Sequence, residues 1–308
     1  MKKLNFNEHF KITTSTDYVN ILLVNDLELF IDPYCIANNQ HEKIAAKIYS
    51  RMKSFFENLN RTYVQTNDRK NGLVFLSHLH EPNEYGFGYS DNNKGKAISR
   101  TKAEIIYDAL SNNKFAKAGV SITNEAHNVL LLVKGIGQDN MSDVIANVCR
   151  DIFAEYTHDQ CSLHGIKTSS SKIEFYDDKI KNWALMDVSL PQYLTKSRLL
   201  VPKILVQNKH AYTAAYNWFI SSNRISAGIL NGTITPPSSS SSKPFVTTLK
   251  SGEKKAIIKR INEHYKKPKE KLVDFVTQFN GSLEDFQIHI KKIFPDLTDE
   301  FLSKILSE

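Results

Sequence analysis

A proline- and serine-rich segment at residues 235–244 most constrains how this chain of 308 residues can fold. Its sequence, TPPSSSSSKP, contains stiff prolines and small polar serines but no large apolar side chain to bury. Such a composition is typical of a linker. We therefore expect a body at residues 1–231, a linker at 232–247 and a helical domain at 248–308.

The body mixes helical and strand patterns without a regular alternation of the two. Apolar residues recur at helical spacing in some segments, while short β-branched or aliphatic runs indicate strands in others. The predicted helices are 40–60, 99–110, 142–157 and 209–221, and the predicted strands are 18–24, 27–32, 73–76, 128–133, 172–176, 183–190 and 200–206. This order predicts an α+β fold in which a mixed β-sheet is flanked by helices.

The C-terminal region predicts a small all-α domain. Its expected helices are 251–266, 269–280, 282–294 and 298–306. A helical domain of this size buries little apolar surface by itself. We expect residues 248–308 to bind a partner protein or a second copy of the chain.

Composition excludes several classes of protein. With 41% hydrophobic and 24% charged residues the chain is of ordinary globular type, and no run approaches the roughly 18 apolar residues of a membrane span. The N-terminus lacks the apolar stretch of a secretory signal, and three cysteines are too few for a disulfide framework. We expect a cytoplasmic protein that does not bind a membrane.

The formal net charge of +7 favours a polyanionic partner such as nucleic acid. The alternative is a lysine-rich, solvated surface that has no target. Charge alone leaves both open.

The segment at residues 77–96 carries the densest group of polar side chains. His78, His80, Glu81 and Glu84 lie within seven residues, directly after a predicted strand. Imidazole nitrogens and carboxylate oxygens bind divalent metals, and either group can act as a general base. A polar surface loop without a role is the alternative.

The second half of this segment partly matches a phosphate-binding loop. Gly88 and Gly95 are separated by six residues rather than four, and Ala97 stands where a metal-binding hydroxyl is required. These departures exclude a P-loop nucleotide hydrolase. Lys94 and Lys96 can still contact a phosphate of DNA or RNA.

A second polar group follows two glycines at residues 135–143. Asp139 and Asp143 lie four residues apart at a predicted helix start, with Asn147 and Arg150 on the next turns. Paired carboxylates can hold Mg²⁺ or Mn²⁺ and activate water for phosphodiester hydrolysis. The alternative is structural, because acidic residues also stabilise helix N-termini.

The Glu-x-Lys signature of restriction-type nucleases is not clearly present. Lys134 ends a predicted strand as that lysine would, but Leu132 occupies the acidic position. A cysteine nucleophile is also poorly supported, since Cys149 falls on the apolar stripe of a predicted helix.

Three motifs nevertheless carry a resemblance. They are LELFIDP at residues 27–33, EPNEYGFGYS at 81–90 and GIGQDNMSD at 135–143. Together they resemble uncharacterised bacterial proteins found beside phage-defence and restriction genes, over about the first 200 residues. The resemblance implies a role in defence and assigns no catalytic residue.

The leading hypothesis is a metal-dependent nuclease, or nuclease-like effector, that acts on DNA or RNA in bacterial antiviral defence. Its metal ligands are Glu81, Glu84, Asp139 and Asp143, and the metal is Mg²⁺ or Mn²⁺. His80 is its general base beside the catalytic pair Asp139 and Asp143, and its phosphate-binding cations are Lys94, Lys96 and Arg150. The alternative is a non-enzymatic subunit that binds nucleic acid or a nucleotide signal and recruits a catalytic partner through residues 248–308.

Overall fold

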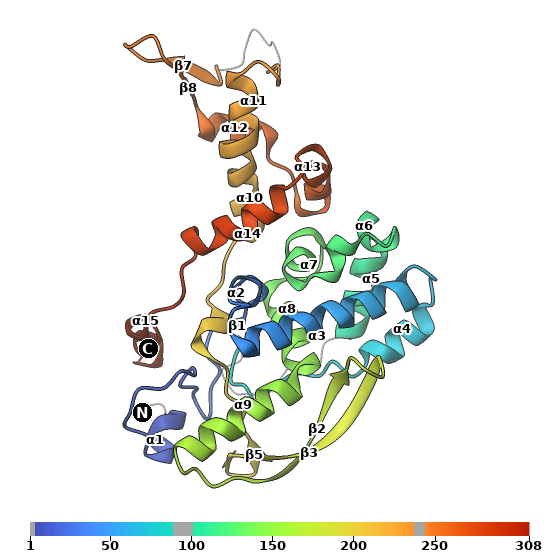
Figure 1. The fold of residues 1–308 in the computed structure, drawn as a ribbon, viewed down its shortest axis with the longest axis vertical. Coiled ribbons are helices and arrows are strands. Elements are labelled where there is room, and N and C mark those ends of the chain that lie inside the picture. Colours follow the sequence, from blue (N-terminus) through green and yellow to red (C-terminus); the bar gives the residue numbers. More distant parts are fainter. Residues whose placement is uncertain (1–3, 89–100, 237–243, 308) are drawn as a thin grey trace. The chain divides into compact units, whose positions relative to one another are not determined.

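A computed structural model describes residues 4–88, 101–236 and 244–307 (Figure 1). Contacts between residues divide the chain into two compact units. Unit 1 comprises Met1–Lys209 and Ile290–Glu308, and unit 2 comprises His210–His289. The chain therefore leaves unit 1 once and later returns to it.

Unit 1 contains more α-helix than β-strand. Its helices are α1 (Phe6–Phe10), α2 (Pro33–Asn38), α3 (Lys43–Leu59), α4 (Arg69–Leu76), α5 (Lys102–Ser111), α6 (Lys114–Lys117), α7 (Ala126–Leu132), α8 (Gln138–Val148), α9 (Arg150–Leu163) and α15 (Asp299–Ser307). The amphipathic helix α3 buries Ile48, Met52 and Phe55 and contacts α2, α7, α8 and α9. The core of unit 1 is therefore built around the apolar face of α3.

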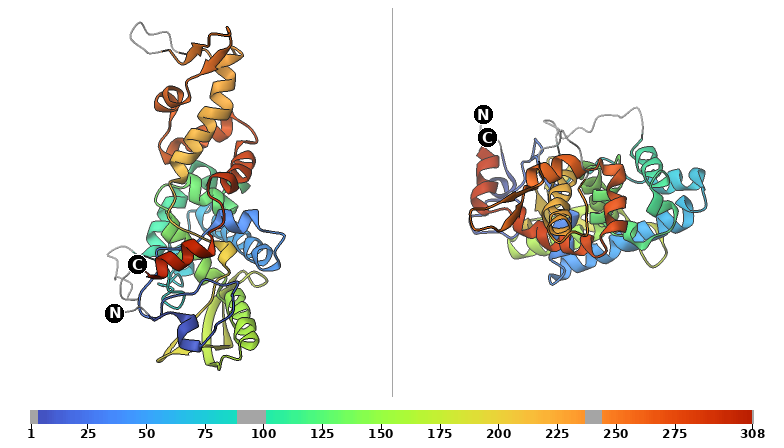
Figure 2. Two further views of the ribbon diagram at one scale, coloured as in Figure 1. Left: turned by 90° about the vertical axis from the view of Figure 1, so that its left-hand side faces the viewer. Right: turned by 90° about the horizontal axis from the view of Figure 1, so that it is seen from above.

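The strands of unit 1 form antiparallel pairs. They are β1 (Phe30–Ile31), β2 (Ser169–Asp177), β3 (Asn182–Leu190), β4 (Gln192–Tyr193), β5 (Lys196–Ser197) and β6 (Val206–Gln207). The longest pair, β2 with β3, aligns Ser169 with Leu190 and Asp177 with Asn182, and it lies along α9 (Figures 1 and 2). The α+β class is confirmed, although the described strands pair two by two rather than in one mixed sheet.

Several predicted strands have a different structure. Residues 128–133 lie mainly in α7 and residues 73–76 in α4, because a short apolar run suits a buried helix as well as a buried strand. The strands predicted at residues 18–24 and 27–32 do not pair with each other, and this region forms only the two-residue strand β1, which pairs with β6. The predicted strand at 200–206 is a 3₁₀ turn (Lys203–Leu205) that leads into β6.

The helix predicted at residues 142–157 starts earlier and is broken. Gly137 is the N-cap of α8, and Cys149, with φ −108° and ψ 22°, separates α8 from α9. Ser142 is therefore inside a helix, where its Oγ accepts a hydrogen bond from the Ile31 backbone N–H at 2.9 Å. The prediction that Cys149 is a core residue is confirmed, since its side chain is fully buried.

Unit 2 packs helices from both sides of the proline- and serine-rich segment. Its elements are α10 (Tyr212–Ile220), α11 (Ser226–Leu230), β7 (Val246–Thr248), β8 (Lys254–Ala256), α12 (Ile258–Tyr265), α13 (Leu272–Gln278) and most of α14 (Ser282–Ile293). Tyr216 of α10 contacts Phe286 of α14 with 4.9 Å between ring centroids, and its hydroxyl lies 2.8 Å from Ser282 Oγ. β8, which pairs with β7, lies in the first part of the helix predicted at residues 251–266.

The boundaries between the two units differ from the domain boundaries that composition predicts. Residues 210–231 belong to unit 2 because their apolar face packs on the later helices, and α15 belongs to unit 1. In unit 1, Gln207 Nε2 donates to the Pro295 carbonyl at 2.8 Å, and Lys203 Nζ lies 2.5 Å from Asp299 Oδ1. Part of the expected linker, residues 237–243, is outside the described residues.

None of the helices in the described ranges combines the length and apolar character needed to cross a bilayer.

Candidate functional site

A row of polar side chains on α8 faces the segment at residues 80–88. Asp139, Asp143 and Asn147 follow one another at intervals of four, which places them on one face of the helix. Asp143 is 6% exposed and Asn147 is 1% exposed. Buried polar groups of this kind need partners, and the facing segment provides some of them.

Hydrogen bonds from the 146–147 turn hold this segment in place. Asn147 Nδ2 donates to the His80 carbonyl at 2.8 Å, and its Oδ1 accepts from the His80 N–H at 3.3 Å. The Tyr85 hydroxyl donates to the Ala146 carbonyl at 2.9 Å. The side chains at 80–84 are therefore positioned by α8 and not by a strand.

Two glycines bring the end of the segment toward Asp139. Gly86 accepts a hydrogen bond from the Leu27 N–H, and Gly88 donates one to the Leu27 carbonyl, both at 2.9 Å. Gly86 has φ +65°, and a Cβ there would lie 3.3 Å from the Leu22 carbonyl oxygen. A Cβ at Gly88 would lie 3.9 Å from Asp139 Oδ1, so the segment passes close to that carboxylate.

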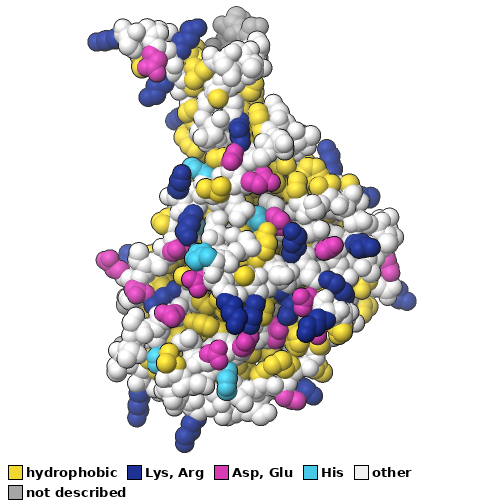
Figure 3. All heavy atoms as spheres, in the orientation of Figure 1, with side chains coloured by type: hydrophobic (Ala, Val, Ile, Leu, Met, Phe, Trp, Pro, Cys, Tyr) yellow, Lys and Arg dark blue, Asp and Glu magenta, His cyan; other side chains and the backbone are white. Residues whose placement is uncertain are grey.

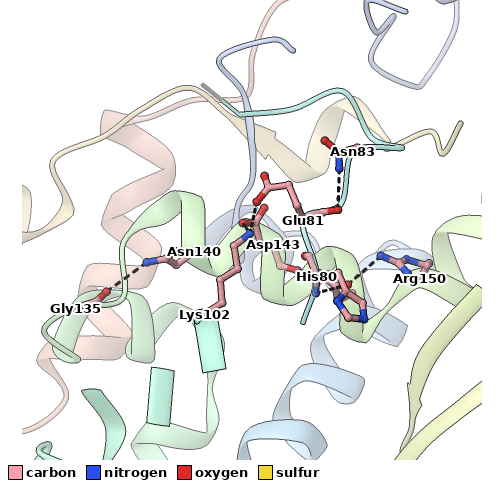
Figure 4. Close-up of polar contacts among 9 residues, drawn as sticks. His80, Glu81, Asn83, Lys102, Gly135, Asn140, Asp143 and Arg150 are labelled. Atoms are coloured by element: carbon pink, nitrogen blue, oxygen red, sulfur yellow. Dashed lines mark hydrogen bonds and ion pairs between the residues drawn. The ribbon is translucent and has the colours of Figure 1, made fainter. Parts of the chain in front are cut away.

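Lys102 forms ion pairs with Glu81 of the 80–88 segment and with Asp143 of α8 (Figure 4). It is the first residue of α5, whose N-cap Thr101 forms a capping box with Glu104. Its ammonium lies 2.7 Å from Glu81 Oε2 and also hydrogen-bonds Asp143 Oδ2. The side chains of Lys102 and Asp143 are 12% and 9% exposed, so their ion pair is largely shielded from water, whereas the Glu81 side chain is 41% exposed.

The cluster of Glu81, Lys102, Asp139 and Asp143 carries more negative than positive charge. Three carboxylates and one ammonium leave a formal charge of −2 when all are ionised. Burial raises the pKa of Asp143 to about 7, although the Lys102 ammonium acts in the opposite direction. Burial also raises the pKa of Asp139, and the Glu81 charge adds to that effect.

Lys102 itself stays protonated. Burial tends to lower its pKa, but Asp143 and Glu81 outweigh burial, so the pKa lies above its ordinary value. The site therefore contains a fixed cation whose charge is too small to balance its acidic neighbours.

The acidic residues suit Mg²⁺ or Mn²⁺ in their chemistry, because carboxylate oxygens are the preferred ligands of hard divalent cations. Within the described ranges, however, no three acidic, histidine or cysteine side chains are arranged as a ligand set. Glu81 and Asp143 are both turned to the Lys102 ammonium instead. A metal ion would bind these oxygens in place of that ammonium.

Other residues predicted for the site lie elsewhere. Glu84 pairs with Arg150, whose Nε is 2.9 Å from Glu84 Oε1, and Arg150 also donates to Asn147 Oδ1 at 2.9 Å. The His80 side chain is 63% exposed, with Nε2 4.0 Å from Glu174 Oε2, and its ring lies beside Arg150, away from Lys102 (Figure 4). Neither His80 nor Glu84 is thus brought to the cluster around Lys102.

His78 is likewise engaged with β2 and β3. Its Nδ1 lies 2.9 Å from Glu174 Oε1, and its ring stacks on Trp183 at 5.2 Å. Lys94 and Lys96 are outside the described residues.

Lys102 is the residue of the site that sequence analysis missed. It lies 21 residues from Glu81 and 41 from Asp143, so no motif or spacing links them. One feature of the sequence could have indicated it. The helix dipole disfavours a cation such as Lys102 at the first position of a helix, so that cation needs a nearby anion.

Comparison with known proteins places this site within a family. Residues 10–213, which are 204 of the 308 residues, match a domain of unknown function, DUF8370. The chain belongs to this family. The DUF8370 match contains all four residues of the cluster around Lys102 and ends just inside unit 2. No curated protein and no solved structure matches the chain.

Proposed function

We propose that this member of the DUF8370 family is a metal-dependent nuclease that acts on DNA or RNA. One observation carries the proposal: Glu81, Asp139 and Asp143 lie around Lys102, and the cluster has a formal charge of −2 when all four groups are ionised. A divalent cation would neutralise that charge. Sites with several carboxylates and a lysine are suited to phosphodiester hydrolysis, because they can combine metal binding with a contact to the phosphate.

Each residue of the cluster around Lys102 has a separate role in this proposal. Asp139 and Asp143 would hold Mg²⁺ or Mn²⁺, and Glu81 would complete the ligands from the facing segment. A metal bound there would supply an activated water and neutralise charge on the phosphate. Lys102, once released from the carboxylates, can bind a phosphate oxygen through its ammonium.

Charge and setting support a nucleic-acid substrate. The net charge of +7 favours a polyanion, although acidic and basic side chains are interspersed on the face drawn in Figure 3. Cys35, Cys149 and Cys161 are all free, buried thiols, as suits a reducing cytoplasm. The role in antiviral defence is inferred from the resemblance of the three sequence motifs.

Cleavage assays test the proposal directly. The full-length protein is incubated with labelled plasmid DNA, single-stranded DNA and RNA in Mg²⁺, in Mn²⁺ and in EDTA. We expect metal-dependent cutting that falls at least about 100-fold in Asp139→Asn and Asp143→Asn, because each removes a ligand charge at the metal. Glu57→Gln, which removes an exposed charge on α3, is the matched control and should cut normally.

The outcomes are distinct once folding is verified by circular dichroism. Cutting that persists in both aspartate variants would refute the site. Absence of cutting by the wild-type protein on all three substrates and with both metals would refute the nuclease.

A second candidate is a non-enzymatic subunit that recruits its partner through unit 2. Unit 2 exposes several large apolar side chains, including Trp218 at 47% and Ile288 at 64%. Such side chains are typical of interaction surfaces. Nucleic-acid binding without cutting, together with an oligomer that dissociates in Trp218→Ser and Ile288→Ser, would favour this function.

A further inference from the structure

A second site lies in unit 1, in a pocket of about 330 Å³. It is formed by Asn83 and Glu84, by the start of α9, by β2 and the end of β3, and by residues 196–199. Four cationic side chains and one carboxylate line it: Arg150, Lys172, Lys196, Arg198 and Glu84. No side chain of the cluster around Lys102 belongs to this pocket.

Arg198 is the most informative of these residues. It is 2% exposed, and its guanidinium donates to the Asn83 carbonyl at 3.1 Å and to the Leu23 carbonyl at 2.5 Å. Its Nε is buried and has no hydrogen-bond partner among the described residues. Burial lowers the pKa of Arg198, yet a guanidinium remains charged in proteins. A buried cation with an unused donor beside a pocket indicates an anionic ligand.

The charges in the pocket are only partly balanced. Arg150, whose side chain is 12% exposed, pairs with Glu84, so this pair contributes no net charge. Arg198, Lys172 and Lys196 form no ion pair among the described residues, although the negative charges of Asp26 and Glu84 act on the Arg198 guanidinium. Three positive charges around one small volume can neutralise a phosphate group.

The rest of the lining sets the size and character of the ligand. Ile173, Leu190 and Leu199 are buried apolar residues, while Ser171 and Ser197, whose hydroxyls lie 2.7 Å apart, also line the pocket. A volume of about 330 Å³ is at the lower end of ligand pockets, which suits a molecule of mononucleotide size and not a polymer chain.

We infer that this pocket binds a small phosphorylated ligand of mononucleotide size. The cations around Arg198 would hold the phosphate, and the wall formed by Ile173, Leu190 and Leu199 would contact the less polar part of the ligand. This inference does not depend on nuclease activity at Lys102. The ligand would also provide an acceptor for the buried Arg198 Nε, which has no hydrogen-bond partner among the described residues.

Isothermal titration calorimetry of the full-length protein tests the inference. The ligands are adenosine 5′-monophosphate, adenosine, inorganic phosphate and a short single-stranded DNA, all in EDTA so that metal-dependent cutting does not interfere. We expect saturable binding of the monophosphate, weaker binding of phosphate and none of adenosine. The double variant Lys172→Gln/Lys196→Gln changes only exposed residues, so it should fold normally and bind the monophosphate about tenfold more weakly.

The matched control removes two other exposed lysines of unit 1. Lys167→Gln/Lys179→Gln has the same net charge as the test variant and should bind like the wild type. Equal weakening in both double variants would show that only net charge matters and would overturn the site. So would adenosine binding as tightly as its monophosphate, binding of the DNA alone, or no binding of monophosphate or phosphate up to about 10 mM.

Discussion

The side-chain amide of Asn147 pairs with both backbone polar groups of His80, 67 residues earlier in the chain. Asn147 Nδ2 donates to the His80 carbonyl at 2.8 Å, and Asn147 Oδ1 accepts from the His80 N–H at 3.3 Å, as the backbone of a neighbouring strand would. One buried side chain thus fixes the segment that carries Glu81 and Glu84. Both candidate sites of unit 1 depend on that segment.

Asn147→Ala should therefore cost about 2–3 kcal/mol of unfolding free energy, because it removes a buried side chain and both of its part-buried hydrogen bonds to the His80 backbone. Urea unfolding followed by circular dichroism measures the loss. Asn71→Ala on the exposed surface of α4 is the matched control and should change stability by less than about 0.5 kcal/mol. Equal losses in the two variants would contradict this role of Asn147.

Lys102→Met should make the protein respond more strongly to divalent cations. The substitution leaves Glu81, Asp139 and Asp143 without their ammonium, so Mg²⁺ would meet no competing charge. We expect a lower melting temperature than the wild type without metal, and a larger rise when Mg²⁺ is added, measured by differential scanning fluorimetry. Lys70→Met, an exposed change on α4, is the control. A response to Mg²⁺ no larger than that of the control would count against metal binding at this cluster.

Arg51 ties α3 to α9 and β2, and its loss should be costly. It forms a bidentate pair with Asp151 at 3.1 and 3.2 Å, and its side chain is 14% exposed. Arg51→Met should cost about 3–5 kcal/mol, because the largely buried Asp151 carboxylate would lose its cationic partner. Arg69→Met, which breaks a half-exposed pair with Asp108, should cost less than about 1 kcal/mol. Chemical denaturation of the two variants under the same conditions makes the comparison.

His127 should make stability depend on pH. Burial lowers its pKa from 6.5 to about 4, so the folded state binds this proton less readily than the unfolded state does. The free energy of unfolding should fall as pH falls from about 6.5 toward 4, since the unfolded chain then gains the proton.

His127→Phe keeps a ring between Tyr34 and Tyr49 but cannot titrate. The difference in unfolding free energy between wild type and His127→Phe should change between pH 7 and pH 5. A pH-independent difference would show that His127 does not titrate in this range.

Long periodic or alternating segments are predictable from this sequence. The predicted helix at 40–60 contains α3, and the strands predicted at 172–176 and 183–190 lie in β2 and β3, because each pattern persists over several turns or residues. Residues 128–133 show the limit. The five consecutive apolar residues 129–133 show no period, so the sequence of a helix that is buried on all sides, such as α7, resembles that of a buried strand.

The candidate site could be predicted only in part. Asp139 and Asp143 are linked by helical spacing, and Glu81 lies in a conspicuously polar segment, so local patterns suffice to single them out. Lys102 and Arg198 depend on contacts between distant parts of the chain. Arg198 pairs with a carbonyl 115 residues away at Asn83, and no local pattern encodes such a contact.

Unit 2 interrupts unit 1 in the order of synthesis. The 80 residues from His210 to His289 (289 − 209) leave the ribosome before Ile290–Glu308, which complete unit 1 through contacts such as Gln207 with Pro295. At about 5–20 residues per second, this delay lasts about 4–16 s. During that time the surface around Gln207 and Lys203 lacks its contacts with Pro295 and Asp299. Chaperones or a neighbouring nascent chain can bind it before α15 is synthesised.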